Sequence, residues 1–346
     1  MRSAAGPGTE RSGSETRIPV LLCVDVEPDQ VEVPRDRPQP WTGFERMLGY
    51  VRELRPRLAD ATGAAVRLNW FLRMDPQVAQ SYGSARWVAD TYRSALTELR
   101  AAGDTLGLHP HAWRWQESTG RWLTDHGNPG WVEECMRTAF DAYADAFGEP
   151  CVAHRFGDRF MSAAVVRVLR ELGVRYDLTI EPGARATRSI HPGTAATGRI
   201  PDHGPALREP YHPAAEDPMR PASRSGTGRQ EGLLWMIPLT AIDPDPLLPI
   251  WRRVARRIRY PDRPRHRPAR LWAPAEPGRF WRIVEDHVVS SPRPYVALAV
   301  RSDIPLRSPL MAAVEAKLES LLSDPFARRL EFTIPGHTLA RLAANI

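Results

Sequence analysis

The sequence predicts an α/β protein built as a (β/α) barrel of seven or eight units. Strand-like and helix-like segments alternate at short spacing, which is typical of parallel strands joined by helices. Polar residues follow several of the predicted strands, where barrel proteins gather their chemistry. The chain has 346 residues and 42% hydrophobic content, enough for one large core, and shows no internal repeat or second domain.

Each element is predicted from its pattern of apolar residues. Short apolar runs predict strands at 20–24, 66–72, 105–108, 151–154, 175–180, 233–237, 295–300 and 330–333. Helical spacing of apolar residues predicts helices at 43–58, 85–101, 129–147, 162–172, 278–289 and 308–322. Ser162 is a candidate cap for the fourth helix and Gly173 can end it.

The remaining segments lack a sustained period. Residues 1–17 are expected to be a disordered tail, and residues 18–346 a single barrel domain. Residues 182–232 and 243–275 are rich in Gly, Pro, Ser and Arg, and we interpret them as long loop insertions at the rim. Rim loops of this kind commonly shape substrate selection.

Two pairs of polar residues predict a metal site. His109 and His111 follow the strand 105–108, and Asp25 and Glu27 follow the strand 20–24. Alternate residues of a strand point to the same side, so each pair can converge on one ion. Imidazole and carboxylate are ligands that zinc and its neighbours accept. A His-x-His pair is also common in cores and on surfaces, which is the alternative for an isolated pair.

Composition narrows the function classes. No run of 18 apolar residues can span a membrane, and residues 1–16 carry no apolar leader, so a cytoplasmic protein is expected. Three cysteines (Cys23, Cys135 and Cys151) do not make a disulfide framework. Serine-hydrolase and phosphate-loop glycine motifs are absent from the sequence.

The net charge of +6 comes from arginine, since only Lys317 of the 47 basic residues is lysine. Nine arginines and one acid lie between Arg252 and Arg270. Because prolines interrupt this stretch, we favour a mobile, solvated loop. Binding of an anion, or of nucleic acid, is the alternative.

Several motifs together resemble the polysaccharide deacetylase or NodB-homology superfamily (carbohydrate esterase family 4 and relatives). Val24-Asp25-Val26-Glu27 is similar to the first motif, Leu106-Gly107-Leu108-His109-Pro110-His111 to the second, and His154-Arg155-Phe156-Gly157-Asp158 to the third. The segments 68–73 and 176–179 resemble the strands that accompany them. The resemblance covers about residues 18–182 well and implies a distorted (β/α)7–8 barrel of the polysaccharide deacetylase type.

The chain departs from the commoner family pattern at three places. The family pattern has adjacent aspartates where this chain has Asp25-Val26-Glu27, and histidines four apart where this chain has them two apart. A branch with a close His-x-His followed by an aromatic residue fits Trp113. The late motif, expected near 295–303, lacks the histidine that acts as general acid in active esterases. His337 is a candidate replacement, but it is better explained as a cap of the last helix, and His126 is our candidate for the acid.

The resemblance implies a mechanism. A divalent metal held by Glu27, His109 and His111 would bind a water molecule, lower its pKa and polarise the scissile carbonyl. Zinc is the first candidate, with cobalt, nickel, iron and manganese as alternatives. Asp25 would act as general base and Arg155 would orient it, although Arg155 could instead pair with Asp158. The roles of Asp25 and Glu27 can be exchanged.

The remaining predictions concern the substrate. Trp113, Asp75 and Asp158 are expected to contact it, and Trp115, Trp122 and Trp131 form either a stacking platform or loop packing. We predict a metal-dependent amide hydrolase that deacetylates an amino sugar or small biosynthetic intermediate. A small-molecule or saccharide substrate is expected, with no membrane partner and no nucleic acid. The alternative is a catalytically degenerate barrel that binds a saccharide or small molecule without hydrolysis.

Overall fold

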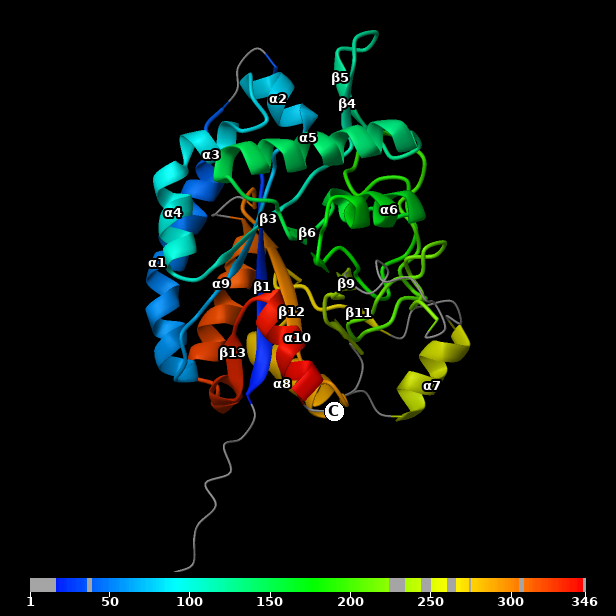
Figure 1. The fold of residues 1–346 in the computed structure, drawn as a ribbon. Coiled ribbons are helices and arrows are strands. Elements are labelled where there is room, and N and C mark those ends of the chain that lie inside the picture. The colour runs from blue at the N-terminus through cyan, green and yellow to red at the C-terminus, as the bar shows by residue number, and fades with distance from the viewer. Residues whose placement is uncertain are drawn as a thin grey trace, which may run out of the picture.

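The fold is organised around one curved parallel sheet (Figure 1). The computed structural model describes residues 17–35, 39–223, 234–243, 250–259, 266–273, 275–304 and 308–344. Seven strands follow the order β12-β1-β2-β3-β6-β7-β9, and β13 pairs with β1 as well. Their bounds are β1 Ile18–Val26, β2 Asn69–Leu72, β3 Thr105–Leu108, β6 Ala153–His154, β7 Tyr176–Asp177, β9 Trp235–Met236, β12 Val296–Arg301 and β13 Leu330–Phe332.

An irregular segment after β9 bridges the two edges of this sheet. The Leu239 N–H donates to the Ile180 carbonyl, and the Thr240 N–H donates to the Ala297 carbonyl of β12, both at 2.8 Å. The barrel is thus closed by single hydrogen bonds rather than by a regular ladder of strand pairing. The predicted fold class, a distorted (β/α)7–8 barrel, is confirmed.

Strand β1 pairs with three other strands, β12, β2 and β13. All nine of its residues are buried, as expected where a parallel strand is covered on both faces. It pairs with β12 on one side and with β2 on the other, so that Asp25 lies in register with Arg301 and Phe71. The carboxyl ends of these strands therefore meet at one end of the barrel.

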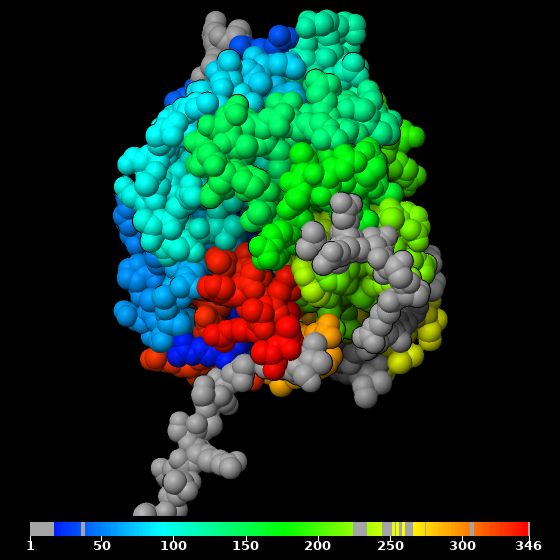
Figure 2. Space-filling view, viewed as in Figure 1, coloured from blue at the N-terminus to red at the C-terminus, as the bar shows by residue number. Residues whose placement is uncertain are grey.

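Helices cover the outside of the sheet (Figure 1). Asn128 and Ser162 cap α5 and α6 by accepting from the N–H groups of Trp131 and Val165. Helix α10 lies beside the start of β1, at the end away from the β4–β5 hairpin (red in Figure 2). The helices are α1 Thr42–Thr62, α2 Pro76–Tyr82, α3 Trp87–Thr91, α4 Arg93–Ala101, α5 Pro129–Phe147, α6 Ala163–Glu171, α7 Ile250–Arg259, α8 Pro277–Val289, α9 Pro309–Leu322 and α10 Pro335–Ala344.

The predicted helix 85–101 is wrong in its continuity, because it breaks at Tyr92 into α3 and α4. The Tyr92 hydroxyl donates to Glu45 and accepts from the Trp41 N–H, and its ring lies edge-on to Phe44 at 5.0 Å. These tertiary contacts with α1 fix Tyr92 outside the helical conformation. Periodicity within the segment could not reveal them.

The rim segments contain more structure than the sequence predicted. Strands β4 (Trp113–Gln116) and β5 (Arg121–Asp125) form a hairpin that β8 (Ala195–Thr197) extends. Strands β10 (Ala241–Ile242) and β11 (Arg267–Pro268) pair with each other. Helix α7 includes residues 252–259, so the prediction of a loop is wrong for this part of the segment 252–270, and residues 260–265 lie outside the described residues. Two 3-10 turns, η1 (Gly157–Arg159) and η2 (Pro325–Arg329), complete the elements.

Other expectations have mixed outcomes. Cys23, Cys135 and Cys151 are free thiols and buried, which agrees with the absence of a disulfide framework. No helix in the described ranges is long and apolar enough to cross a membrane. Residues 1–16 lie outside the described residues, so the disordered tail stays a prediction, as do the single-domain organisation and the cytoplasmic location.

Gly107 tests the packing between neighbouring barrel strands. A Cβ at this position would lie 2.7 Å from the Ala153 carbonyl oxygen and 2.8 Å from the Phe71 ring. We expect Gly107→Ala to reduce the free energy of unfolding by about 1–3 kcal/mol through overpacking. The control is Gly49→Ala in α1, where nothing lies within 4 Å of the new Cβ. This control should stabilise the helix by about 0.5–1 kcal/mol. Urea unfolding of both variants measures the difference, and equal stability would contradict the packing.

Candidate metal centre

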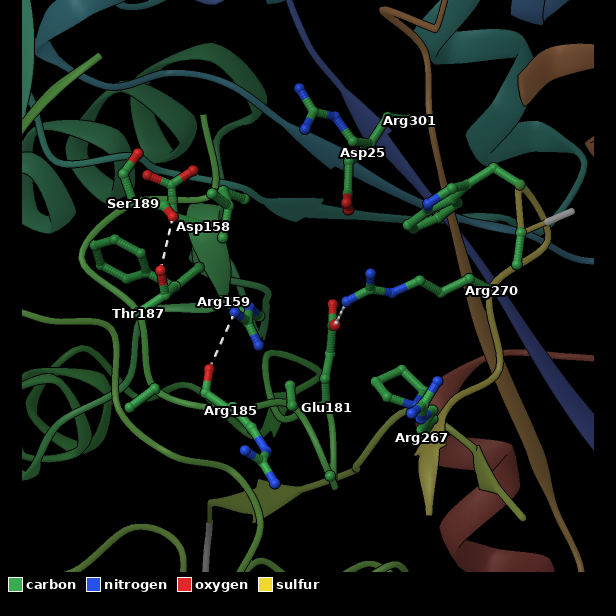
Figure 3. A pocket seen from close by; sticks show the side chains of 18 of the residues that line it. Asp25, Asp158, Arg159, Glu181, Arg185, Thr187, Ser189, Arg267, Arg270 and Arg301 are labelled. Carbon is green, nitrogen blue, oxygen red and sulfur yellow. Dashed lines mark hydrogen bonds and ion pairs between the residues drawn. The ribbon is translucent and has the colours of Figure 1, made fainter. Parts of the chain in front are cut away.

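A large cavity opens at the carboxyl ends of the barrel strands. Its volume is about 1710 Å³. Its lining brings together most of the predicted site residues from three different strand ends, and Figure 3 labels two of them, Asp25 and Asp158. The predicted residues that line it are Asp25, Glu27, His109, His111, Arg155 and Asp158.

Glu27, His109 and His111 place their ligand atoms around one point. The two Nε2 atoms are 3.2 Å apart, and the Glu27 carboxylate oxygens lie 3.4 Å from His109 Nε2 and 3.5 Å from His111 Nε2. Tetrahedral zinc with bonds of 2.0–2.1 Å would hold its ligand atoms about 3.3–3.4 Å apart. All three side chains are buried, and the triad can hold a metal ion.

The hydrogen bonds of His109 suit it as a ligand. His109 Nδ1 lies 2.6 Å from the Arg155 carbonyl oxygen, to which only a protonated Nδ1 can donate. Nε2 of His109 is therefore left with its lone pair directed at the triad. His111 Nδ1 accepts from the Trp113 indole N–H at 3.1 Å and lies 3.4 Å from Asp158 Oδ1. In a neutral ring this hydrogen bond leaves the proton on Nε2, and a metal ion bound there would have to displace it.

Guanidinium groups keep Glu27 ionised. Burial raises the pKa of Glu27, but Arg301 and His111 outweigh this effect and hold it well below its usual value. Arg301 Nε lies 3.3 Å from Glu27 Oε1, and Arg73 Nη1 donates to Oε2 at 3.2 Å. Burial and Arg73 lower the pKa of His111, whereas Glu27 and Asp158 raise it to about 9. A metal ion binding here would displace that proton.

Asp25 lies beside the triad and is held by Arg155. Arg155 Nε donates to both carboxylate oxygens, at 2.9 and 3.1 Å, and its Nη1 donates to the Leu178 carbonyl. Asp25 Oδ1 is 3.7 Å from His109 Nδ1. The other expected partner of Arg155, Asp158, does not accept from it in the described hydrogen bonds.

A strained turn carries Asp158 to the back of the triad. Asp158 and Arg159 have φ values of +53° and +52°, a left-handed conformation that costs an L-residue about 1–2 kcal/mol. Gly157 precedes them because a Cβ there would lie 2.1 Å from the His111 ring. His191 Nε2 is 2.8 Å from Asp158 Oδ1. Although burial opposes it, contacts with His111 and His191 hold the pKa of Asp158 well below its usual value.

Asp75 and Trp113, predicted to contact the substrate, are not among the residues that line the cavity. Asp75 is fully buried, where it caps α2, accepts from Arg73 at 2.6 Å and accepts from the His111 N–H at 2.9 Å. Trp113 is fully buried against His111. Both residues position His111 instead, and the aromatic side chains that line the cavity are Phe156 and Trp272.

His126, the candidate general acid, lies behind Asp158 and does not line the cavity. Its ring stacks on Phe160 at 4.5 Å, and neither ring nitrogen has a hydrogen-bond partner among the described residues. Burial lowers the pKa of His126, which disfavours the protonated form that a general acid needs. His337 lies in the first turn of α10, beside Arg67, and does not line the cavity.

Sequence reasoning missed two charged residues of the centre, Arg73 and Arg301, and placed Glu181 only at a strand end, without a role. Arg73 directly follows β2, and Arg301 ends β12 at the place where the resemblance led us to expect a histidine. Glu181 accepts from Arg155 at 3.3 Å. The strand ends were a usable signal, but all except one of the 47 basic residues are arginine, so no single arginine stood out.

Known proteins resemble this chain in structure rather than in sequence. A comparison of the sequence with protein-family models finds no match, and a search of curated proteins finds none either. Comparison of structures gives the fold. The chain is similar to a putative glycoside hydrolase/deacetylase from Parabacteroides distasonis, with a TM-score of 0.51 and 13% identity over 95% of this chain and 72% of that chain. It is also similar to a putative polysaccharide deacetylase from Mycobacterium smegmatis, with a TM-score of 0.45 and 14% identity over 99% and 95% of the two chains. The similarity to the Parabacteroides distasonis protein supports the barrel fold.

Arg73 should be critical for stability because it neutralises buried carboxylates. It donates to Glu27, Asp75 and Gln77, and its side chain is 1% exposed. We expect Arg73→Met to cost about 3–5 kcal/mol of unfolding free energy, since it leaves buried charges unpaired. The control Arg93→Met removes an exposed pair with Asp90 and should cost less than about 1 kcal/mol. Urea unfolding compares them, and a small loss in Arg73→Met would show that the pair is not needed.

Proposed function

We propose that the protein is a metal-dependent amide hydrolase that removes an acetyl group from an amino sugar or a small biosynthetic intermediate. The observation that carries this proposal is the spacing of the Glu27, His109 and His111 ligand atoms, with the Asp25 carboxylate beside them. The deacetylase-type fold supports the same reaction class.

Glu27, His109 and His111 would hold the metal, with zinc as the first candidate. A divalent ion bound there supplies a Lewis acid that activates water and polarises an acyl oxygen. Arg301 and Arg73 keep Glu27 charged and fixed, since both guanidiniums lie within 3.3 Å of its oxygens. Asp158 supports His111 from behind, at 3.4 Å.

Asp25 is the general base in this proposal. Arg155 fixes both of its oxygens, so the carboxylate is oriented without substrate. It takes a proton from the attacking water as the C–O bond forms, and it can return that proton to the leaving nitrogen as the C–N bond breaks. Arg301 cannot serve as the acid, because Glu27 and Asp303 hold the pKa of its guanidinium above the usual value despite its burial. One carboxyl group thus carries the proton in both steps.

A barrel that binds a ligand without hydrolysis is the second candidate. Two observations favour it. The Glu27 carboxylate is already paired with two guanidiniums, which compete with a metal ion for its oxygens. Strand β12 ends in Arg301, where the resemblance predicted a histidine acting as general acid. The two candidates differ in whether the triad takes up metal. Metal content therefore separates them.

We expect about one zinc, cobalt, nickel, iron or manganese ion per purified chain, measured by mass spectrometry after dialysis. The double variant His109→Ala, His111→Ala should lose it, because two of three ligands are gone. His337→Ala removes an exposed histidine at the far end of the barrel and should keep the metal. Absence of metal in the unmodified protein after reconstitution would instead support the ligand-binding barrel.

The role of Asp25 can be separated from that of His126 by kinetics. With an N-acetylated amino sugar as substrate, Asp25→Asn should retain metal and lose about 10²–10⁴-fold in kcat, the usual contribution of general acid–base catalysis. His126→Gln should change kcat by less than about fivefold, because His126 does not line the cavity. A large loss in His126→Gln with unchanged stability would restore it as the acid.

A further inference from the structure

The wall of the cavity away from the acid–histidine triad is rich in arginine. Eight arginines and four carboxylates line the cavity among the described residues. The arginines are Arg155, Arg159, Arg185, Arg252, Arg259, Arg267, Arg270 and Arg301, and the carboxylates are Asp25, Glu27, Asp158 and Glu181. The lining as a whole is therefore more basic than a neutral glycan requires.

The four carboxylates are already engaged near the triad. Asp25 is bonded to Arg155 at 2.9 Å, and Asp158 faces His191 at 2.8 Å. Glu27 lies 3.3 Å from Arg301. Glu181 reaches toward the arginine wall, where it accepts from Arg270 at 3.2 Å.

Four of these residues form what we call the arginine rim: Arg159, Arg185, Arg267 and Arg270. In Figure 3, Arg267 and Arg270 lie on one side of Glu181, and Arg159 and Arg185 lie on the other. Arg159 belongs to the turn η1 and Arg267 to β11, so distant segments of the chain supply the two sides.

Arg159 is a residue of the rim whose guanidinium is only partly hydrogen-bonded by the described residues. Its Nη2 donates to the Arg185 carbonyl at 3.3 Å, and its Nε is buried without a hydrogen-bond partner among the described residues. Burial lowers the pKa of Arg159; Glu181 opposes this effect, and Arg270 adds to it. A strained backbone, with φ of +52°, holds this incompletely partnered cation at the cavity wall. An anionic group on a ligand would supply the missing acceptor.

We propose that the arginine rim binds a phosphoryl group, so that the substrate is a phosphorylated N-acyl small molecule, such as an amino sugar phosphate. Guanidinium forks match phosphate geometry, and a phosphoryl group with about two negative charges can accept from more than one guanidinium at once. The substrate assignment rests on the proposed function, whereas phosphoryl binding at the rim does not. Trp272, which lines the cavity beside Arg270, offers a flat face to the rest of such a molecule.

The test is calorimetric titration of chelator-treated protein with inorganic pyrophosphate, which keeps metal out of the measurement. We expect saturable binding that weakens with salt. Arg159→Gln and Arg185→Gln should each weaken it at least tenfold, the size expected for loss of a charge-assisted contact. Arg185 is exposed, so its variant keeps the test valid if Arg159→Gln is unstable. Arg46→Gln on the exposed face of α1 is the control and should change affinity less than about twofold.

Two further arms separate the outcomes. N-acetylglucosamine 1-phosphate should bind at least tenfold more tightly than N-acetylglucosamine, and the His109→Ala, His111→Ala variant should still bind pyrophosphate. If the protein binds pyrophosphate but takes up no metal, the proposed hydrolase function is wrong and phosphoryl binding at the arginine rim is supported. If the protein hydrolyses a neutral N-acetyl sugar and does not bind pyrophosphate, the proposal that the arginine rim binds a phosphoryl group is wrong. Tighter binding of RNA or DNA than of pyrophosphate, with the same loss in both rim variants, would also overturn it in favour of a nucleic-acid site.

Discussion

The pairing of buried carboxylates with buried guanidiniums at the ends of the barrel strands is the interaction on which the rest of the centre depends. Arg73 and Arg155 each join two acids, Glu27 with Asp75 and Asp25 with Glu181. Charges taken out of water are tolerated only when they are paired and hydrogen-bonded in this way. The network therefore gives each of these buried carboxylates a guanidinium partner inside the barrel.

This network also orients the groups that the proposed reaction would use. Asp25 is held through both oxygens, and the His109 ring is oriented by a backbone carbonyl, so neither group needs to reorganise when a substrate enters. Asp75 contributes without touching the cavity, because it fixes both Arg73 and the His111 backbone. Residues outside the lining thus decide the geometry of those within it.

The cavity has two chemically different ends, which different segments of the chain supply. The strand ends supply the acid–histidine triad, and the turn η1 together with the segment around β11 supplies the arginine rim. Glu181 and Arg155 connect the two ends through their hydrogen bond. A reacting acyl group at one end and a recognised anion at the other would position a small substrate along the cavity.

The sequence by itself determined the barrel, the elements 105–108 and 129–147 and the meeting of Asp25, Glu27, His109, His111 and Arg155, because strand periodicity and the carboxyl ends of parallel strands are local properties. Only the tertiary structure decided the break at Tyr92, the burial of Trp113, Asp75 and His126 away from the cavity, and the helix α7. It also decided that Arg73 and Arg301 hold Glu27, and that Arg159 faces Arg270 across Glu181. These features depend on contacts between segments far apart in the chain. The identity of one arginine, or the composition of one loop, does not predict which distant residue it will contact.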